Sequence, residues 1–388
     1  MRFLVTGGAG FIGSNYVRHL LATDPDAHVT NFDKLTYAGN RASVADLDGD
    51  PRHRFIQGDI CDPDQVAEAI AGHDVVVNFA AETHVDRSIV EPLEAVRTNT
   101  VGVATLAEAA RSAGVGRFLQ VGTDEEYGTI SEGSFAEDDR LEPSSPYSAG
   151  KAGGSLVALA YAATHKLDVV VTRCTNNYGP YQFPEKVIPL FVTNLMDGHK
   201  VPLYGSGGNI RDWLFVLDHC SAIDLVLRRG QTGAIYNVGG GNEVTNLELT
   251  RRILTAFGAG EDMIDFVADR PGHDWRYSLD TSRVRELGWA PAHDFDQGLA
   301  ETIAWYRDHE PWWRPMKPTG ATRTLDHGRA GPTRLVSSSP GPGGRWGGPS
   351  RPPSPTPRSW SPSTGPASTS PAGRRWPTPW PSSPPTWW

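Results

Sequence analysis

A tyrosine and a lysine, Tyr147 and Lys151, stand four residues apart in a stretch with a helical pattern that begins near Pro146. Residues at this spacing lie on the same face of a helix. An ammonium group beside a phenol favours the phenolate and lowers the pKa of the phenol. The pair therefore predicts an oxidoreductase site in which Tyr147 takes a proton from a hydroxyl as a hydride leaves for a nicotinamide. Lys151 can also hold the nicotinamide ribose.

Two adjacent acids, Asp124 and Glu125, follow Thr123 just after an apolar run at residues 117–121. Eliminating water needs one group that removes a proton from carbon and another that protonates the departing hydroxyl. Carboxylates in different surroundings can divide these roles. We therefore treat Thr123, Asp124 and Glu125 as candidate catalytic residues beside Tyr147 and Lys151. The alternative interpretation is a solvated pair of loop acids.

Three glycines, Gly7, Gly10 and Gly13, follow the first apolar run and open a helical pattern that includes Phe11 and Ile12. Glycines at this spacing let the backbone turn tightly and approach a pyrophosphate, which the helix N-terminus then attracts. A lone glycine triplet is weak evidence, but here a strand precedes it and a helix follows. The pattern predicts a dinucleotide site formed by these five residues.

The next apolar run ends in Asp33, about 20 residues beyond the turn, where such sites carry an acid. A carboxylate there can accept from a ribose 2′-hydroxyl and would repel a 2′-phosphate, so NAD is favoured over NADP. Asp59 and Ile60, after the third run, are expected to touch the adenine. The alternatives are a strand-end cap at Asp33 and a plain loop acid at Asp59.

The elements that position these residues alternate between strand and helix patterns. Strands are predicted at residues 3–6, 28–33, 54–57, 74–80, 117–121 and 168–174, and helices at 11–21, 63–71, 92–113 and 146–165. The alternation indicates an α/β fold with a doubly wound parallel sheet of the Rossmann type. Residues 1–175 are predicted to form the NAD-binding domain. Residues 176–317 are expected to form mainly a smaller substrate-binding lobe, with segments that can return to the first sheet.

Residues 318–388 are rich in Pro, Ser, Arg and Trp and contain very few branched aliphatic residues. Such a segment cannot bury enough apolar surface to offset its ordering entropy. We expect a disordered tail that is not part of the enzyme.

The whole composition limits the classes of function. A net charge of −9 gives no reason to expect nucleic-acid binding. No apolar run approaches the roughly 18 residues of a membrane span. Three scattered cysteines, Cys61, Cys174 and Cys220, argue against a disulfide framework and against a zinc site. A cytoplasmic enzyme without a metal is expected.

Several segments resemble the extended short-chain dehydrogenase/reductase family and, within it, the dTDP-glucose 4,6-dehydratases. The resemblance covers roughly residues 1–317. It lies in TGGAGFIGSN (6–15), NFAAETHVDRSI (78–89), TDEEYG (123–128), SPYSAGKAG (145–153), NNYGPYQFPEKVIP (176–189), GNIRDWLFVLDH (208–219), GGGNEVTN (239–246) and DRPGHDWRYSLD (269–280).

The resemblance implies a mechanism on a nucleotide sugar, with dTDP-glucose the favoured substrate. Tyr147 would deprotonate the hydroxyl on carbon 4, to which Thr123 hydrogen-bonds, as the hydride on that carbon passes to NAD. Glu125 would remove the acidified proton on carbon 5, and Asp124 would protonate the hydroxyl leaving carbon 6. Return of the hydride to carbon 6 gives a 4-keto-6-deoxy sugar.

The resemblance also implies substrate contacts and an assembly. The contacts are Thr83, Asn176, Glu185, Lys186, Tyr204, Arg211, Asn242, Arg270 and His273. The two arginines suit a diphosphate because their forked donors bind its oxygens in pairs. A homodimer through a helix pair, residues 92–113 with 146–165, is expected.

Alternatives stay open. A UDP-sugar 4-epimerase, a UDP-glucuronate decarboxylase and a GDP-mannose 4,6-dehydratase share the glycine turn and the Tyr–Lys pair. An epimerase does not need the acid pair, and only the base-contact segment around Glu185 and Lys186 separates the GDP-mannose enzyme. A non-catalytic protein that keeps NAD is the remaining alternative.

Four residues in the matching segments differ from the family's usual residues or are unfavourable in a helix. Glu126 stands where the family usually has an apolar residue, and an extra acid there could shift the pKa of its neighbours. Gly150 replaces a usual serine. Gly153 and Gly154 are poor helix residues, and close packing against the cofactor or the sheet would explain them.

Overall fold

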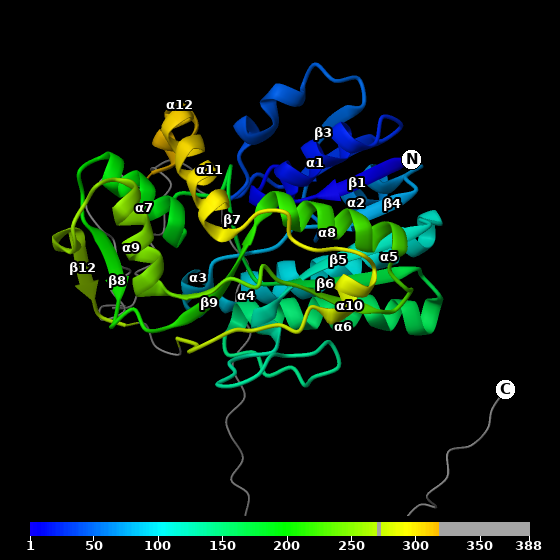
Figure 1. The fold of residues 1–388 in the computed structure, drawn as a ribbon. Coiled ribbons are helices and arrows are strands. Elements are labelled where there is room, and N and C mark those ends of the chain that lie inside the picture. Colours follow the sequence, from blue (N-terminus) through cyan, green and yellow to red (C-terminus); the bar gives the residue numbers. More distant parts are fainter. Residues whose placement is uncertain (270–272, 318–388) are drawn as a thin grey trace, which may run out of the picture. The chain divides into compact units, whose positions relative to one another are not determined.

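The computed structural model describes residues 1–269 and 273–317 (Figure 1). Its main sheet has seven strands in the order β10-β6-β5-β4-β1-β2-β3, and every neighbouring pair is parallel. The strands are β1 (Arg2–Thr6), β2 (His28–Asp33), β3 (His53–Gln57), β4 (Val75–Asn78), β5 (Arg117–Thr123), β6 (Val169–Cys174) and β10 (Ile235–Val238). The predicted doubly wound sheet is confirmed. The expected disorder of residues 318–388 lies outside the described residues.

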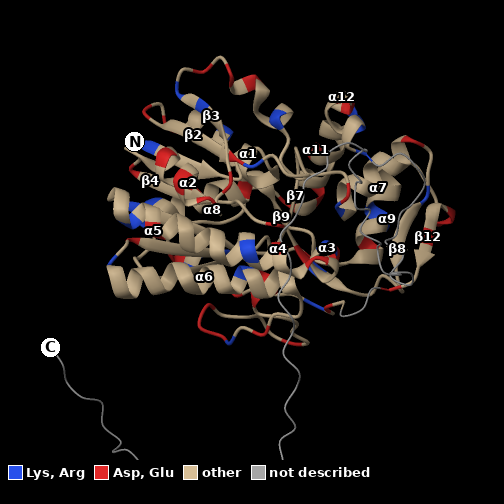
Figure 2. Ribbon diagram, turned by 180° about the vertical axis from the view of Figure 1, so that it is seen from behind, with Lys and Arg blue, Asp and Glu red and all other residues tan. Residues whose placement is uncertain are grey.

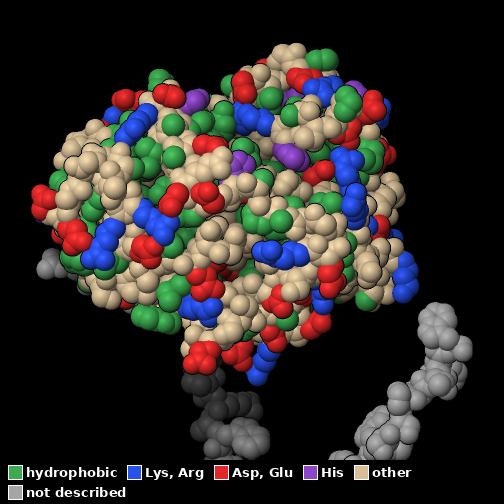
Figure 3. All heavy atoms as spheres, viewed as in Figure 1, with side chains coloured by type: hydrophobic (Ala, Val, Ile, Leu, Met, Phe, Trp, Pro, Cys, Tyr) green, Lys and Arg blue, Asp and Glu red, His purple; other side chains and the backbone are tan. Residues whose placement is uncertain are grey.

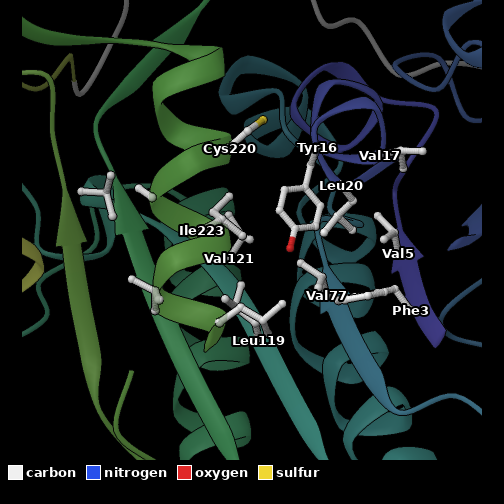
Figure 4. Close-up of a cluster of buried hydrophobic side chains, with 14 of the residues drawn as sticks. Phe3, Val5, Tyr16, Val17, Leu20, Val77, Leu119, Val121, Cys220 and Ile223 are labelled. Carbon is white, nitrogen blue, oxygen red and sulfur yellow. The ribbon is translucent and has the colours of Figure 1, made fainter. Parts of the chain in front are cut away.

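Helices cover both faces of this sheet. On one face α1 (Phe11–Thr23) lies beside α8 (Val216–Arg229), and on the other α2 (Pro63–Ile70), α5 (Val103–Ala113) and α6 (Pro146–His165) lie together (Figures 1 and 2). The central strands are buried on both faces, so successive residues point into different cores. Val5 packs with Tyr16 and Leu20 beneath α1 (Figure 4), whereas Leu4 packs with Val66 and Leu106.

The chain after Cys174 builds two small sheets with a core of their own. β11 (Glu243–Thr245), β9 (Ile210–Phe215) and β7 (Asn176–Tyr178) form one sheet, and β12 (Ile264–Val267) pairs with β8 (Val201–Tyr204). They pack with α7 (Val187–Met196), α9 (Asn246–Ala256), α11 (Phe295–Asp308) and α12 (Glu310–Trp313). Strand β10 returns from this part of the chain to the main sheet. The division into two lobes at residue 176 stays a prediction.

Short elements complete the described chain. They are η1 (Arg41–Leu47), α3 (Val85–Val90), α4 (Pro92–Val96), η2 (Arg97–Gly102), η3 (Asp124–Glu126), η4 (Glu261–Met263), α10 (Ser282–Glu286) and η5 (Arg314–Met316). The helix predicted over residues 92–113 is therefore three elements, because a π-helical turn at η2 separates α4 from α5.

The glycines of α6 face this π-helical turn. A Cβ on Gly153 would lie 2.7 Å from Thr100 Oγ1, and one on Gly154 would collide with the carbonyl oxygen of Asn99. The expected packing against the cofactor or the sheet is thus wrong. These glycines let α6 approach η2 closely, which brings the helix that carries Tyr147 and Lys151 against the helices before β5.

The surface seen in Figure 3 intersperses acidic and basic side chains without a large field of one sign. Among the described residues, no helix has the length and apolarity needed to cross a membrane.

Candidate active site

A cavity of about 290 Å³ lies at the carboxyl ends of the main strands, where ligands bind in sheets of this kind. Every residue predicted for the cofactor or for catalysis lines it: Gly7, Gly10, Phe11, Ile12, Gly13, Asp33, Asp59, Ile60, Thr123, Asp124, Glu125, Tyr147 and Lys151. The fold therefore gathers these residues from the ends of four strands, β1, β2, β3 and β5, and from the start of α6 around one space. Their individual roles stay predictions.

The glycine turn fits a close-lying diphosphate. Gly7 has a φ of +67°, and a Cβ there would lie 2.6 Å from the backbone nitrogen of Ala80. Helix α1 begins after its N-cap residue, Gly10, which has no side chain. The first turn of α1 therefore has no side-chain cap among the described residues. The N–H groups of that turn thus face a place where an anion is favoured.

The two predicted acids of the cofactor site are tied to the backbone around it. Asp33 accepts hydrogen bonds from the backbone N–H of Ala9 (2.9 Å) and of Leu35 (2.7 Å), and burial raises the pKa of its carboxyl. Asp59 pairs with Lys34 Nζ at 2.8 Å. Both carboxylates are thereby oriented at the cavity wall. The buried side chain of Ile60 lies close to Gly102, the last residue of η2.

Helix α6 begins where the sequence predicts. Ser145 caps it in a reciprocal pair with Ser148, and Pro146 occupies its first turn. Lys151 is almost fully buried and donates to the carbonyl oxygen of Val121 at 2.6 Å. Burial lowers the pKa of its ammonium, and the charge of Glu126 opposes that shift.

The pKa of Tyr147 differs from the expectation. Burial raises it well above the usual range, and the charges of Glu125 and Asp124 raise it further. Lys151 therefore does not dominate the ionisation of this phenol in the structure, because its ammonium is directed at the Val121 carbonyl and two carboxylates lie close by.

The acid pair lies on a single 3-10 turn, η3, that Thr123 caps. Asp124 is 3% exposed, and its Oδ1 accepts from Thr123 Oγ1 at 3.1 Å, while its Oδ2 is buried without a hydrogen-bond partner among the described residues. Burial raises the pKa of Asp124 well above its usual range, and the charge of Glu125 raises it further. Glu125 is only partly buried. The two carboxyls thus occupy different surroundings, as a division into acid and base requires.

Four predicted substrate contacts line the same cavity: Thr83, Asn176, Glu185 and Lys186. Lys186 Nζ donates to the carbonyl oxygen of Thr83 at 3.0 Å. Glu185 lies 3.5 Å from His84 and 3.6 Å from Arg87, and burial raises the pKa of its carboxyl.

Four of the other predicted substrate contacts do not line it: Tyr204, Arg211, Asn242 and His273. Arg211 is buried, donates to the carbonyl oxygen of Asp274 at 2.8 Å and stacks over Tyr277, while Asn242 donates to the carbonyl oxygen of Trp213. The ring of Tyr204 lies against that of His273. Arg270 lies outside the described residues. Arg211 is nevertheless coupled to the site, since its charge lowers the pKa of Asp124.

Sequence reasoning missed Asn99 as a residue of the site. Its side-chain amide holds the backbone of Glu82, a cavity residue, through both its oxygen (2.9 Å) and its nitrogen (3.0 Å). A polar residue within a helical pattern was the only signal. Among the described residues, no group of His, Cys, Asp or Glu is arranged to hold a metal ion.

Comparisons with known proteins identify the family of this chain. Residues 4–302 match the family described as GDP-mannose 4,6 dehydratase. A dTDP-glucose 4,6-dehydratase of Streptomyces niveus is 57% identical over 83% of this chain and 98% of its own length. The crystal structure of DesIV, a dTDP-glucose 4,6-dehydratase from Streptomyces venezuelae with NAD bound, superposes with a TM-score of 0.80 at 55% identity, covering 82% and 100%. A Thermus thermophilus UDP-glucose 4-epimerase with NAD is 32% identical, with a TM-score of 0.73, covering 80% and 100%.

Proposed function

Because the chain belongs to the family described as GDP-mannose 4,6 dehydratase and, within it, to the dTDP-glucose 4,6-dehydratases, we propose that its cavity dehydrates dTDP-glucose with NAD. The observation that carries this function is one cavity lined by a dinucleotide turn, by the Tyr147–Lys151 pair and by two carboxyls in unlike surroundings. An epimerase has the lower identity and does not need the acid pair. The family's GDP-mannose description is outweighed by relatives at 45–57% identity whose names specify dTDP-glucose.

The residues of the dinucleotide turn suit NAD. The open first turn of α1 would bind the diphosphate, and Asp33 would accept from an adenosine ribose hydroxyl. Asp59 and Ile60 would flank the adenine, and Lys151 would hold the nicotinamide ribose. Bound here, NAD supplies a hydride acceptor at carbon 4 and later a hydride donor at carbon 6, and the positive charge of its oxidised ring opposes the carboxylates that raise the pKa of Tyr147.

Residues at the start of α6 and at the end of β5 would carry out the oxidation at carbon 4. Tyr147 takes the proton of the carbon 4 hydroxyl, and Thr123 hydrogen-bonds the same oxygen. In the structure Lys151 donates to the carbonyl oxygen of Val121, and its ammonium would help to stabilise the phenolate if it turned toward Tyr147 when NAD and the sugar bind.

Elimination falls to η3. A ketone at carbon 4 acidifies the proton on carbon 5, which Glu125 removes. Asp124 gives its proton to the hydroxyl that leaves carbon 6. A raised pKa suits Asp124 to this role, because its carboxyl keeps a proton at a pH where an ordinary aspartate has lost it. Its buried Oδ2 has no partner among the described residues and is placed to donate that proton.

The nucleotide and sugar need contacts from further along the chain. Thr83, Asn176, Glu185 and Lys186 already line the cavity. Tyr204, Arg211, Asn242, Arg270 and His273 would complete the site around the diphosphate and the base, with the arginines on the phosphate oxygens.

We further propose a homodimer. The proposed interface between the two copies consists of large apolar residues that are exposed on α3, α4, η2 and α6: Ile89, Val90, Leu93, Val96, Val101 and Leu156. Leu93 is 80% and Val90 69% exposed, and α6 carries Lys151 as its one charged side chain, so that it is almost uncoloured in Figure 2. An apolar surface of this kind suits an interface with a second copy. The three unpaired cysteines fit the proposed cytoplasmic location.

The substrate is tested by incubating the full chain, without added NAD, with dTDP-glucose, UDP-glucose and GDP-mannose separately. Mass spectrometry of each nucleotide sugar should show loss of one water from dTDP-glucose alone. Loss only from GDP-mannose would identify the sibling dehydratase. No loss from any sugar, also after NAD is added, together with tightly bound NAD, would favour a protein that binds NAD without this chemistry.

A further inference from the structure

Glu126 is a fully buried carboxylate and the last residue of η3, the turn that carries Asp124 and Glu125. Its Oε1 accepts from the backbone N–H of Thr123 at 3.2 Å and from Ser155 Oγ at 3.0 Å. Its Oε2 accepts from Nε of Arg173 at 2.8 Å, and that guanidinium is itself 1% exposed. One side chain thus joins the end of β5, the middle of α6 and the end of β6.

The surroundings hold this carboxylate in a single position. A Cβ on Gly122 would lie 2.5 Å from Oε1, so the glycine leaves the space that Glu126 fills. Arg173 Nη1 donates to the hydroxyl of Tyr127 at 2.8 Å, and that hydroxyl donates to Asn237 Oδ1 at 2.9 Å. The ion pair is therefore satisfied on each side by neutral partners.

Stability alone does not explain a buried ion pair, because well-packed apolar residues usually serve stability as well or better. What Glu126 does that an apolar residue cannot is to accept from Thr123 and Ser155 at once. Ser155 lies one turn beyond Lys151 on α6. The carboxylate therefore sets the distance between the turn that carries Asp124 and Glu125 and the helix that carries Tyr147 and Lys151.

We propose that Glu126 is a positioning residue for the dehydration, which fixes the acid pair of η3 relative to the Tyr–Lys pair of α6. The proposal rests on the proposed function. Without this link, Tyr147 and Lys151 keep their own supports at Ser88, Ser145 and Val121, so the sugar is still oxidised. The displaced acids then eliminate water slowly, and the oxidised sugar that still holds its carbon 6 hydroxyl builds up.

Two double variants separate this role from the charge and from packing. Glu126→Gln with Arg173→Met removes the ion pair but keeps an amide oxygen for Thr123 and Ser155. Glu126→Val with Arg173→Met removes the ion pair and also the acceptor oxygen for Thr123 and Ser155. For each variant the melting temperature is measured. Turnover of dTDP-glucose and accumulation of oxidised sugar are then followed by rapid-quench mass spectrometry. The valine variant should lose at least about tenfold in turnover, since small misplacements at an active site cost this much, and should accumulate sugar that has lost two hydrogens but no water. The glutamine variant should stay within about threefold of the wild type without accumulation.

Ser155→Ala provides a third variant that keeps the ion pair and removes one donor to Oε1, should either double variant fail to fold. It should show a smaller accumulation of the same oxidised sugar. Equal behaviour of the two double variants, or slow turnover with no oxidised sugar in the valine variant and in Ser155→Ala, would overturn the proposal. A wild-type chain that dehydrates none of the nucleotide sugars would instead reject the proposed function.

Discussion

The identity of the candidate catalytic residues could be predicted from the sequence, but their burial and the direction of their pKa shifts could not. The neighbouring acids at 124 and 125 were recognisable because two carboxylates at a strand end have few structural reasons to be there. Which of them is buried depends on packing around η3, and no spacing in the sequence encodes it. The same holds for Tyr147, whose pKa follows burial and nearby carboxylates rather than the lysine four residues on.

At this scale Asp124→Asn separates oxidation from elimination. The amide cannot donate the acid proton, so product formation should fall by about 10²–10⁴-fold, the usual contribution of a positioned acid. Oxidised, undehydrated sugar should accumulate in rapid-quench mass spectrometry. Product formed at the wild-type rate would exclude Asp124 as the acid.

The pH dependence of the wild type follows from the same residue. The pKa of Asp124 is raised, so its carboxyl keeps the proton at a pH below that raised value. The carboxyl loses this proton as the pH rises through that value. Turnover should therefore decline on the alkaline side, and the residual activity of Asp124→Asn should lack that decline.

At the scale of elements, the strong alternation of the first 175 residues placed the sheet and its main helices within a few residues. The exception is the predicted helix 92–113, which is divided by the π-helical turn η2, and α6 packs closely against this region at three of its glycines. A π-helical turn has no distinct apolar period, so the break could not be read from the sequence. Asn99 lies in that turn and holds the cavity residue Glu82.

Gly154→Ala tests this contact. A Cβ there would meet the Asn99 carbonyl and lie 3.0 Å from Val103 Cγ2. Overpacking should outweigh the gain in helix propensity and destabilise the fold by about 1–3 kcal/mol. Denaturant unfolding measures it, with Ala160→Ser on the exposed side of α6 as the control, expected within about 0.5 kcal/mol. A Gly154→Ala protein as stable as this control would show that α6 and η2 do not need the contact.

At the scale of the whole chain, the part after residue 175 was the least predictable. Its short strands are separated by segments that contain Pro and Gly, and their pairing joins residues far apart in the sequence, as in β9 with β7 and β11. Arg211 reaches the neighbourhood of Asp124 only through that pairing. Resemblance to known segments, rather than periodicity, singled it out.

The proposed dimer predicts a change of mass in solution. Leu93→Glu places a charge on the exposed apolar surface of α4 and should convert a sedimenting dimer to a monomer with an unchanged circular dichroism spectrum. Leu217→Glu, on α8 at the opposite face of the sheet, should remain dimeric. A wild-type chain that sediments as a monomer would contradict the assembly.

A chain that ends after Lys317 should keep the melting temperature and the turnover of the full chain. The relatives are matched over 96–100% of their own length by only 79–85% of this chain, so part of this chain has no counterpart in them. Lys317 itself is kept, because its ammonium pairs with Asp197 at 2.6 Å. A shorter chain that melts earlier or loses turnover would give the last segment a role in the enzyme.

In the proposed function, one cavity oxidises carbon 4, eliminates water and returns the same hydride to carbon 6. The most direct measurement uses dTDP-glucose carrying deuterium on carbon 4, with the full chain in ordinary water and the product examined by NMR. The deuterium should appear in the carbon 6 methyl group, because the hydride taken from carbon 4 is the one returned to carbon 6. Deuterium still on carbon 4, or a dehydrated product with none on carbon 6, would contradict it.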